Sequence, residues 1–362
     1  MLVPLSWLKE YVDISDISVD DLQKKMSAAG LSVERKHTVG EGIEQIVIGQ
    51  IVSQEKHPDS DHLWLCKVNV GANEVQIVTG AQNIYLHGKV PVVQAGQVLP
   101  DGTQIEVSKL RGVESQGMMC SENELGLGEG HEGIMMLGED APVGENLVKY
   151  LGLPDVVFDT EITANRGDCL SIVGIAREVA TLLNKELRMP EALSMQTNMD
   201  FGIKAQVHIE DVSKCNRFAT VAYDGFQLGK SPMWMQQRLL RAGMRPINNL
   251  VDISNYVMLE LGQPTHAYDA KHVNDNTFYV RSALYHEKLQ TLDKKVFDLT
   301  EDMLVIADSE KNLGIAGIMG GESSKITEDT HTLLLELANF DPVNIRKTGM
   351  KLGIRRDAIV RF

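Results

Sequence analysis

Residues 45–52, Gln45-Ile46-Val47-Ile48-Gly49-Gln50-Ile51-Val52, open the stretch that decides how this chain folds. Similar short runs of apolar and β-branched residues follow at 63–70, 75–78 and 90–93, with Gly or Asn in the turns between them. Short strands at this spacing are typical of a compact β-barrel. The sequence therefore predicts a barrel of roughly 110 residues over 39–150.

The segments on either side of the barrel are expected to form one small α/β domain. Before the barrel, Ser18 and an acidic first turn begin a helix that Gly30 closes. After it, Ser171 is the expected cap of a helix over 172–187, whose apolar residues recur at helical spacing. We predict a discontinuous domain of residues 1–38 plus 151–195, with the barrel inserted into it, because surface sites tolerate domain insertion.

A third module is predicted over 200–362, after a stretch at 189–198 with the composition of a linker. Here strands alternate with a helix in which Ser231 and Pro232 are expected as cap and first residue, and which Gly243 ends. A length of 362 residues suits two or three domains at roughly 100–200 residues each. The predicted class is multidomain α+β.

The composition excludes several classes of protein. A hydrophobic content of 43% and a charged content of 23% exclude wholesale disorder. No apolar run approaches the roughly 20 residues that cross a bilayer, so we expect a cytoplasmic protein without membrane contact. A net charge of −15 opposes tight nucleic-acid binding unless a local basic patch or another subunit provides it. The cysteines form no CxxC pair and are expected to be buried free thiols: Cys66, Cys120, Cys169 and Cys215.

Two polar clusters have competing interpretations. A turn in the barrel holds His57, Asp59, Asp61 and His62, which could bind a metal as in a metal-dependent hydrolase; hydrated side chains in a turn are the commoner arrangement.

The second cluster lies in the loop Thr163-Ala164-Asn165-Arg166-Gly167-Asp168, ahead of the helix that Ser171 caps. Helix N-termini attract anions, so the loop could hold a phosphate. We favour the alternative that Arg166 and Asp168 tie the loop to the start of the helix.

The third module contains one residue whose burial is energetically costly. Glu336 lies inside the apolar, strand-like run 333–338, where an ionised carboxylate needs a hydrogen-bonding partner. The glycines of 314–321 suit a turn or a close backbone approach to a ligand. His266, after Gln263-Pro264, would by itself be interpreted as a structural histidine.

The barrel resembles a known RNA-binding domain. Its segments 49–52, 57–63 and 110–121, with the run Ser115-Gln116-Gly117-Met118, are similar to the OB-fold tRNA-binding domain of bacterial phenylalanyl-tRNA synthetase beta subunits, methionyl-tRNA synthetases and free tRNA-binding proteins. The resemblance places Ser115 and Gly117 around the binding face. The candidate basic contacts are Lys56, Lys89, Lys109 and Arg111. The span 39–150 holds 16 acidic and 6 basic residues, a net charge of −10, which predicts weak binding.

The third module resembles the editing domain of the same beta subunits. The segments that carry the likeness are 243–260, 262–269, 314–321 and 333–342, and residues 163–179 are similar to the first domain of these subunits. The resemblance therefore covers essentially the whole chain. It implies an OB-fold barrel inserted in a small α/β domain, followed by a mixed α/β editing domain. It also implies a hydrolytic pocket lined by Glu336, His266, Asn255 and Gly317, with Glu336 accepting a tyrosine hydroxyl.

The implied function is that of a phenylalanine–tRNA ligase beta subunit, which binds tRNA(Phe) and hydrolyses tyrosyl-tRNA(Phe) during protein synthesis. The family assembles two alpha and two beta subunits. ATP and Mg²⁺ are expected for the whole enzyme, and no cofactor or metal for this segment, which carries no P-loop. The aminoacylation site, the anticodon-binding domain and the family's magnesium site are expected outside it.

One position departs from the family pattern. In Gly353-Ile354-Arg355-Arg356-Asp357, Arg356 stands where the family has a threonine on the pocket wall. A long cation there could block the pocket or pair with Glu336. The alternative function is a truncated or divergent relative that binds RNA or a partner without catalysis.

Overall fold

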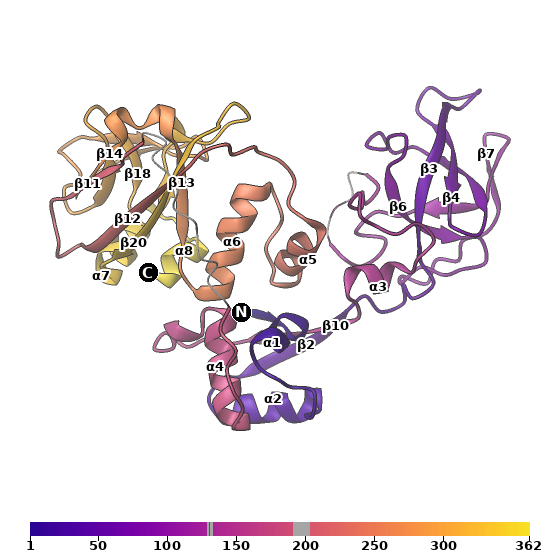
Figure 1. Ribbon diagram of the computed structural model, residues 1–362, viewed down its shortest axis with the longest axis horizontal. Coiled ribbons are helices and arrows are strands. Elements are labelled where there is room, and N and C mark those ends of the chain that lie inside the picture. Colours follow the sequence, from indigo (N-terminus) through magenta and orange to yellow (C-terminus); the bar gives the residue numbers. More distant parts are fainter. Residues whose placement is uncertain (129, 131–132, 191–202) are drawn as a thin grey trace. The chain divides into compact units, whose positions relative to one another are not determined.

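The computed structural model describes residues 1–128, 130, 133–190 and 203–362 (Figure 1). These residues divide into two compact units. The first unit comprises Met1–Glu10, Ile17–Glu161 and Ser231–Pro246, and the second comprises Tyr11–Asp16, Ile162–Lys230 and Ile247–Phe362. Residues 191–198 of the predicted linker, and the predicted domain limits at 195 and 200, lie outside the described residues.

The first unit carries thirteen complete elements and all but the last residue of α1. They are β1 (Leu2–Pro4), α1 (Leu5–Tyr11), α2 (Val19–Ala28), β2 (Val33–Val39), β3 (Val47–Lys56), β4 (Trp64–Asn69), β5 (Glu74–Thr79), β6 (Lys89–Gln94), β7 (Ser108–Leu110), β8 (Val113–Ser115), β9 (Gly117–Met119), α3 (Leu147–Leu151), β10 (Asp155–Thr160) and α5 (Met233–Arg241).

The predicted barrel is a five-stranded antiparallel sheet in the order β5-β4-β3-β6-β9. Its edges come together where the Gln116 N–H donates to the Gln76 carbonyl at 2.8 Å, so the sheet is nearly closed. Gly49 is needed inside it, because a Cβ there would lie 2.6 Å from methyl groups of Val68 and Val92. The prediction of a barrel made of short strands is confirmed.

A second, three-stranded sheet pairs the segments that flank the barrel in sequence. Its order is β1-β10-β2, and both pairings are antiparallel. The adjoining α5 supplies Arg241, whose buried guanidinium lies 3.3 Å from Asp155 and donates to the Leu151 carbonyl at 2.6 Å. The predicted cap of α2 is confirmed, since the Ser18 hydroxyl accepts from the Asp21 N–H. The domain limits at 38, 151 and 195 stay a prediction.

The second unit carries the remaining elements. They are η1 (Gly167–Cys169), α4 (Ile172–Leu183), β11 (Gln206–Ile209), β12 (Cys215–Tyr223), α6 (Asn249–Leu261), β13 (Thr265–Asp269), η2 (Ala270–His272), η3 (Asn274–Asn276), β14 (Thr277–Ser282), β15 (Lys288–Gln290), β16 (Val296–Asp298), β17 (Leu304–Ala307), β18 (Asn312–Ile315), β19 (Met319–Gly320), η4 (Glu322–Ser324), β20 (Leu333–Phe340), α7 (Pro342–Leu352) and α8 (Asp357–Arg361).

Two larger sheets build this unit and share one hydrophobic core. One has the order β11-β14-β17-β18-β19, in which β11 and β14 are parallel and the other pairs antiparallel. The other is antiparallel with the order β12-β20-β13. Phe218 and Leu334 of the second sheet and Phe278 and Val305 of the first belong to the same buried cluster. The predicted mixed α/β character is confirmed.

Local sequence signals predicted some helix ends correctly and others not. Ser171 caps α4 as predicted, but the helix ends at Leu183 rather than 187 because Asn184 adopts the left-handed conformation. The predicted cap at Ser231 is wrong: the Met235 N–H donates to the carbonyl of Pro232, so Pro232 itself occupies the N-cap of α5. Within the described residues, no helix has both the length and the apolar character to cross a membrane.

Candidate active site

A pocket of ≈100 Å³ in the second unit is lined by residues from both of its large sheets. The three-stranded sheet and the approach to it supply Pro264, Thr265, His266, Tyr268 and Glu336. The five-stranded sheet supplies Ile306 and residues 314–320 of the β18–β19 hairpin. Ala358 and Phe362, in and after α8, complete the lining. The walls are therefore mainly apolar, with a few polar side chains on one side.

Three polar residues lie side by side across the three-stranded sheet, and two of them, His266 and Glu336, line the pocket. Glu336 of β20 lies opposite His266 of β13 and opposite Thr220 of β12. Side chains that are directly opposite in antiparallel strands share a face, with Cβ atoms about 4.5–5.5 Å apart. The apolar run predicted as a strand places Leu334, Glu336 and Ala338 on the buried face. One carboxylate is thereby inserted into the core.

Glu336 has the hydrogen-bonding partner that its burial requires. The Tyr268 hydroxyl donates to Glu336 Oε2, and both side chains are buried, with 1% of Tyr268 and 7% of Glu336 exposed. Burial raises the pKa of Glu336 to about 7, although the hydrogen bond from Tyr268 acts in the opposite direction. Sequence reasoning predicted a partner but missed Tyr268. The signal was present, because residues two apart in a strand share a face and His266 was already a candidate.

His266 is held between a backbone and a ring. A Cβ at Gly320 would lie 2.4 Å from both Cε1 and Nε2 of His266, so the imidazole lies directly against this glycine. On another side the ring meets Tyr268 edge-on, with centroids 4.6 Å apart and planes at 84°. Burial lowers the pKa of His266 to about 4. The imidazole is therefore neutral at neutral pH and is suited to orient a water or a hydroxyl.

Gly317 lies in the β18–β19 turn and is among the residues that line the pocket. Its φ of +65° is a conformation that favours glycine. A Cβ there would also lie 2.8 Å from Ile345 Cδ1 and 3.1 Å from the Phe362 ring. The turn expected for this glycine-rich segment occurs, and its close backbone contacts are with protein side chains.

Two other residues expected at the pocket take different places. Asn255 lies on α6, half-buried, and is not among the described residues that line the pocket. Arg356 is exposed at the N-terminus of α8 and is likewise absent from the lining. Arg356 therefore neither blocks the pocket nor pairs with Glu336, whose carboxylate is bonded to Tyr268.

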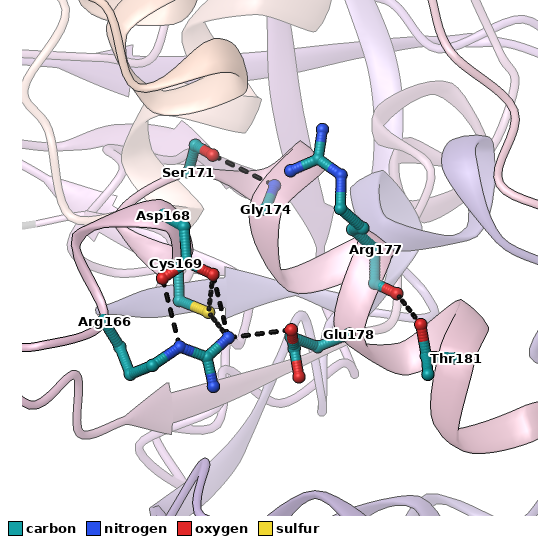
Figure 2. Close-up of polar contacts among 8 residues, drawn as sticks. All are labelled: Arg166, Asp168, Cys169, Ser171, Gly174, Arg177, Glu178 and Thr181. Carbon is teal, nitrogen blue, oxygen red and sulfur yellow. Dashed lines mark hydrogen bonds and ion pairs between the residues drawn. The ribbon is translucent and has the colours of Figure 1, made fainter.

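The loop before α4 is a closed ionic cluster (Figure 2). Arg166 donates to both carboxylate oxygens of Asp168, at 3.0 and 2.8 Å, and lies 2.8 Å from Glu178 of α4. Asp168, Cys169 and Glu178 have the spacing of metal ligands, but the Arg166 guanidinium occupies the space among them. The structure confirms that the loop is tied to the helix, at Glu178 in its second turn.

The barrel turn does not form a metal site. The Nδ1 atom of His57 accepts from the Asp59 N–H at 3.1 Å, so Nε2 carries the proton and donates to the Leu110 carbonyl at 3.1 Å. Both ring nitrogens are engaged in joining this turn to the β7–β8 hairpin. Among the described residues, the one group of three with metal-ligand spacing is that around Arg166. Neither ring nitrogen of His57 is therefore free to bind a metal, as the metal interpretation of His57, Asp59, Asp61 and His62 would require.

The predicted tRNA-binding residues of the barrel divide into two groups. Ser115 is buried, accepts from the Val78 N–H and donates to the Gly117 carbonyl, and a Cβ at Gly117 would lie 2.5 Å from the Val93 carbonyl oxygen. These two residues hold strands together. The exposed cations are Lys56 at the end of β3 and Lys109 and Arg111 in the β7–β8 hairpin. Lys89 is half-buried and donates to the Glu139 carbonyl at 2.5 Å.

Comparison with known proteins gives matches to two family models, and relatives that are similar along the whole length of this chain. Residues 46–146 match the putative tRNA binding domain, and residues 214–362 match the B3/4 domain. The chain is 44% identical over its whole length to the phenylalanine–tRNA ligase beta subunit of Clostridium acetobutylicum, of which it covers 46%. It is 44% identical to that of Fusobacterium nucleatum and 43% identical to that of Geobacter sulfurreducens, and covers 45% of each. The chain thus spans about half the length of these curated relatives.

Proposed function

Because this chain corresponds along its whole length to the N-terminal-type part of the phenylalanine–tRNA ligase beta subunit family, we propose that it binds tRNA(Phe) and hydrolyses tyrosyl-tRNA(Phe). The observation that carries the hydrolytic part is the carboxylate of Glu336, buried on the wall of an otherwise mainly apolar pocket. A site selective for phenylalanine rejects an added hydroxyl only modestly, so tyrosine needs a second, correcting site.

Glu336 is the group that recognises the added hydroxyl. A buried acceptor favours a ligand that donates to it and disfavours one that leaves it unpaired. With a pKa of about 7, the group is about half ionised at neutral pH and accepts a hydrogen bond from a phenol. The apolar walls, including Ile306 and Phe362, accommodate the aromatic ring. Glu336 therefore distinguishes tyrosine from phenylalanine.

Hydrolysis is assigned to an oriented water. Thr265 supplies the one side-chain hydroxyl besides that of Tyr268 among the described lining residues, and it is already hydrogen-bonded to Ser254 Oγ at 2.7 Å. The nearby thiol of Cys215 has a pKa raised to about 11 by burial and is protonated at neutral pH. An aminoacyl ester is reactive, so positioning of water and donors to the developing oxyanion are sufficient. His266 and the backbone of Gly317 are the proposed contacts, with Asn255 toward the terminal ribose.

The barrel is proposed to contact tRNA weakly. Its exposed cations at Lys56, Lys109 and Arg111 lie around one turn and one hairpin, which the hydrogen bond between His57 and Leu110 joins. The net charge of −10 over 39–150 leaves little attraction beyond this patch. Most of the affinity for tRNA is therefore assigned to the complete enzyme.

The complete ligase is proposed to contain two alpha and two beta subunits and to act in the cytoplasm. ATP and Mg²⁺ belong to the aminoacylation reaction of the whole enzyme. The described part of this chain does not fit the metal: its one group with suitable spacing includes a thiol and is filled by the Arg166 guanidinium. No step proposed for this chain involves ATP or Mg²⁺.

The test is single-turnover deacylation of tyrosyl-tRNA(Phe), with the protein in molar excess over the tRNA. We expect hydrolysis well above the spontaneous rate, and a milder loss in His266→Ala than in Glu336→Ala, because orienting a water is a smaller task than recognising the substrate. Tight tRNA binding without hydrolysis would instead support the alternative of a non-catalytic RNA-binding relative.

A further inference from the structure

The hydrogen bond between Tyr268 and Glu336 divides the carboxylate into an occupied and an open oxygen. Tyr268 donates to Oε2. No described residue donates a hydrogen bond to Oε1. Oε1 is also not one of the fully buried side-chain atoms without a partner, so the protein does not enclose it. Glu336 lines the pocket, so Oε1 is the oxygen that a ligand can reach.

Tyr268 is itself fixed in place. Its side chain is 1% exposed, its ring meets Phe278 at a centroid distance of 5.2 Å, and it meets His266 edge-on at 4.6 Å. A phenol held on two sides has one orientation for its hydroxyl, and this orientation is directed at Glu336. A carboxylate with one oxygen bound to such a group loses the freedom to rotate.

We propose that Tyr268 is a positioning residue for substrate selection: its hydroxyl holds Glu336 with Oε1 turned to the pocket and favours the ionised form that accepts a substrate phenol. This inference rests on the proposed function. One carboxylate oxygen, Oε2, accepts a hydrogen bond from the phenol of Tyr268. The other oxygen, Oε1, is left to accept a hydrogen bond from the phenol of the substrate.

Few of the described titratable groups lie close enough to influence the ionisation of Glu336. The titratable side chains that face Glu336 are Tyr268 and His266 of β13 and Cys215 of β12. The lining residues of β17, of the β18–β19 hairpin and of the C-terminal segment carry no titratable side chain. No Lys, Arg or His forms an ion pair with Glu336 within the described residues. Tyr268 is thus the donor that offsets the desolvation of the carboxylate.

The matched control lies on the other side of Glu336. Thr220 is its cross-strand neighbour on β12, and the buried Thr220 hydroxyl has no hydrogen-bond partner among the described residues. Thr220→Val removes a hydroxyl from the same neighbourhood without removing a bond to the carboxylate. Tyr268→Phe removes the bonded hydroxyl with an equally small change of shape.

The experiment is the ratio of tyrosyl-tRNA to phenylalanyl-tRNA deacylation rates, measured in single turnover with the full chain between pH 6 and 9. In the parent we expect the ratio to rise with pH around 7. In Tyr268→Phe the midpoint should move upward by about one to two pH units, the effect of losing a hydrogen bond to a charged group. Thr220→Val should keep the midpoint of the parent.

Two measurements separate the failure of this inference from that of the proposed function. The ¹³C resonance of the Glu336 carboxyl, titrated without tRNA, should show the same upward shift of pKa in Tyr268→Phe. In a Glu336→Gln background, Tyr268→Phe should no longer alter the pH dependence. If the parent deacylates neither ester, the proposed function is wrong. If the parent discriminates and Tyr268→Phe leaves both the pH profile and the carboxyl pKa unchanged, the positioning role is wrong.

Discussion

The contact between Gly320 and His266 makes Gly320→Ala a sharp test of the site. A Cβ at Gly320 would lie 2.4 Å from Cε1 and Nε2 of His266, whereas ordinary contact begins at 3.4 Å. The imidazole would have to move by about 1 Å, and the Tyr268 ring at 4.6 Å limits the space available. Gly320 has an ordinary φ, so the substitution adds no backbone strain of its own.

The expected cost of Gly320→Ala has two parts. Overpacking in a well-packed region typically costs about 1–3 kcal/mol of stability. Misplacing a positioning group by about 1 Å can cost about a hundredfold in rate. We therefore expect a modest loss of stability with a large loss of deacylation, since His266 lies on the pocket wall.

The assay is urea unfolding together with single-turnover deacylation of tyrosyl-tRNA. Gly229→Ala is the matched control, because Gly229 lies in the same unit, has an ordinary φ and would place its Cβ 4.0 Å from the nearest non-adjacent residue, at Asn249 Nδ2. This control should retain the stability and rate of the parent. A Gly320→Ala protein as stable and as active as the parent would refute the placement of His266.

Charge and topology lead to three further predictions. Burial raises the folded-state pKa of Glu336 to about 7 from 4.5, so ionisation opposes folding and stability falls as pH rises through that window. Glu336→Gln should therefore be more stable than the parent at pH 8, by up to about 3 kcal/mol, with no gain at pH 4; equal urea midpoints at pH 8 would contradict this. Lys56→Ala or Arg111→Ala should each reduce the slope of log affinity for tRNA against log salt by about 1, while Lys149→Ala, whose cation pairs with Glu145, should not. Excising residues 40–150 with a short linker should leave β1, β10 and β2 paired, as slow amide exchange would show; exchange at the unfolded rate would argue against an inserted barrel.

The architecture was predictable where local sequence determines structure. Short apolar runs with Gly and Asn turns identified the barrel strands, and Ser18 and Ser171 marked helix starts because their side chains cap neighbouring N–H groups. The apolar, strand-like run 333–338 implied that Glu336 is buried, as it is in β20. Ser231 failed as a cap because the following proline took that position.

The site was less predictable because it depends on strand pairing between distant segments. Tyr268 and Glu336 are 68 residues apart, and their bond follows from the register of β13 on β20. The contact of His266 with Gly320 likewise joins two different sheets. For Arg356, the family pattern indicated a position near the pocket wall but not the direction of the side chain, which depends on where α8 begins. Asn255 shows the same limit on α6.

The most direct test of the central claim is the ratio of tyrosyl-tRNA to phenylalanyl-tRNA deacylation by the parent and by Glu336→Ala, with Arg356→Thr as a control. We expect the parent to favour the tyrosyl ester strongly. Loss of a hydrogen bond to a charged group should reduce the preference in Glu336→Ala by about 10- to 100-fold. Arg356→Thr should retain the ratio of the parent, because Arg356 is exposed. A parent that discriminates, with Glu336→Ala discriminating equally well, would contradict the role assigned to Glu336.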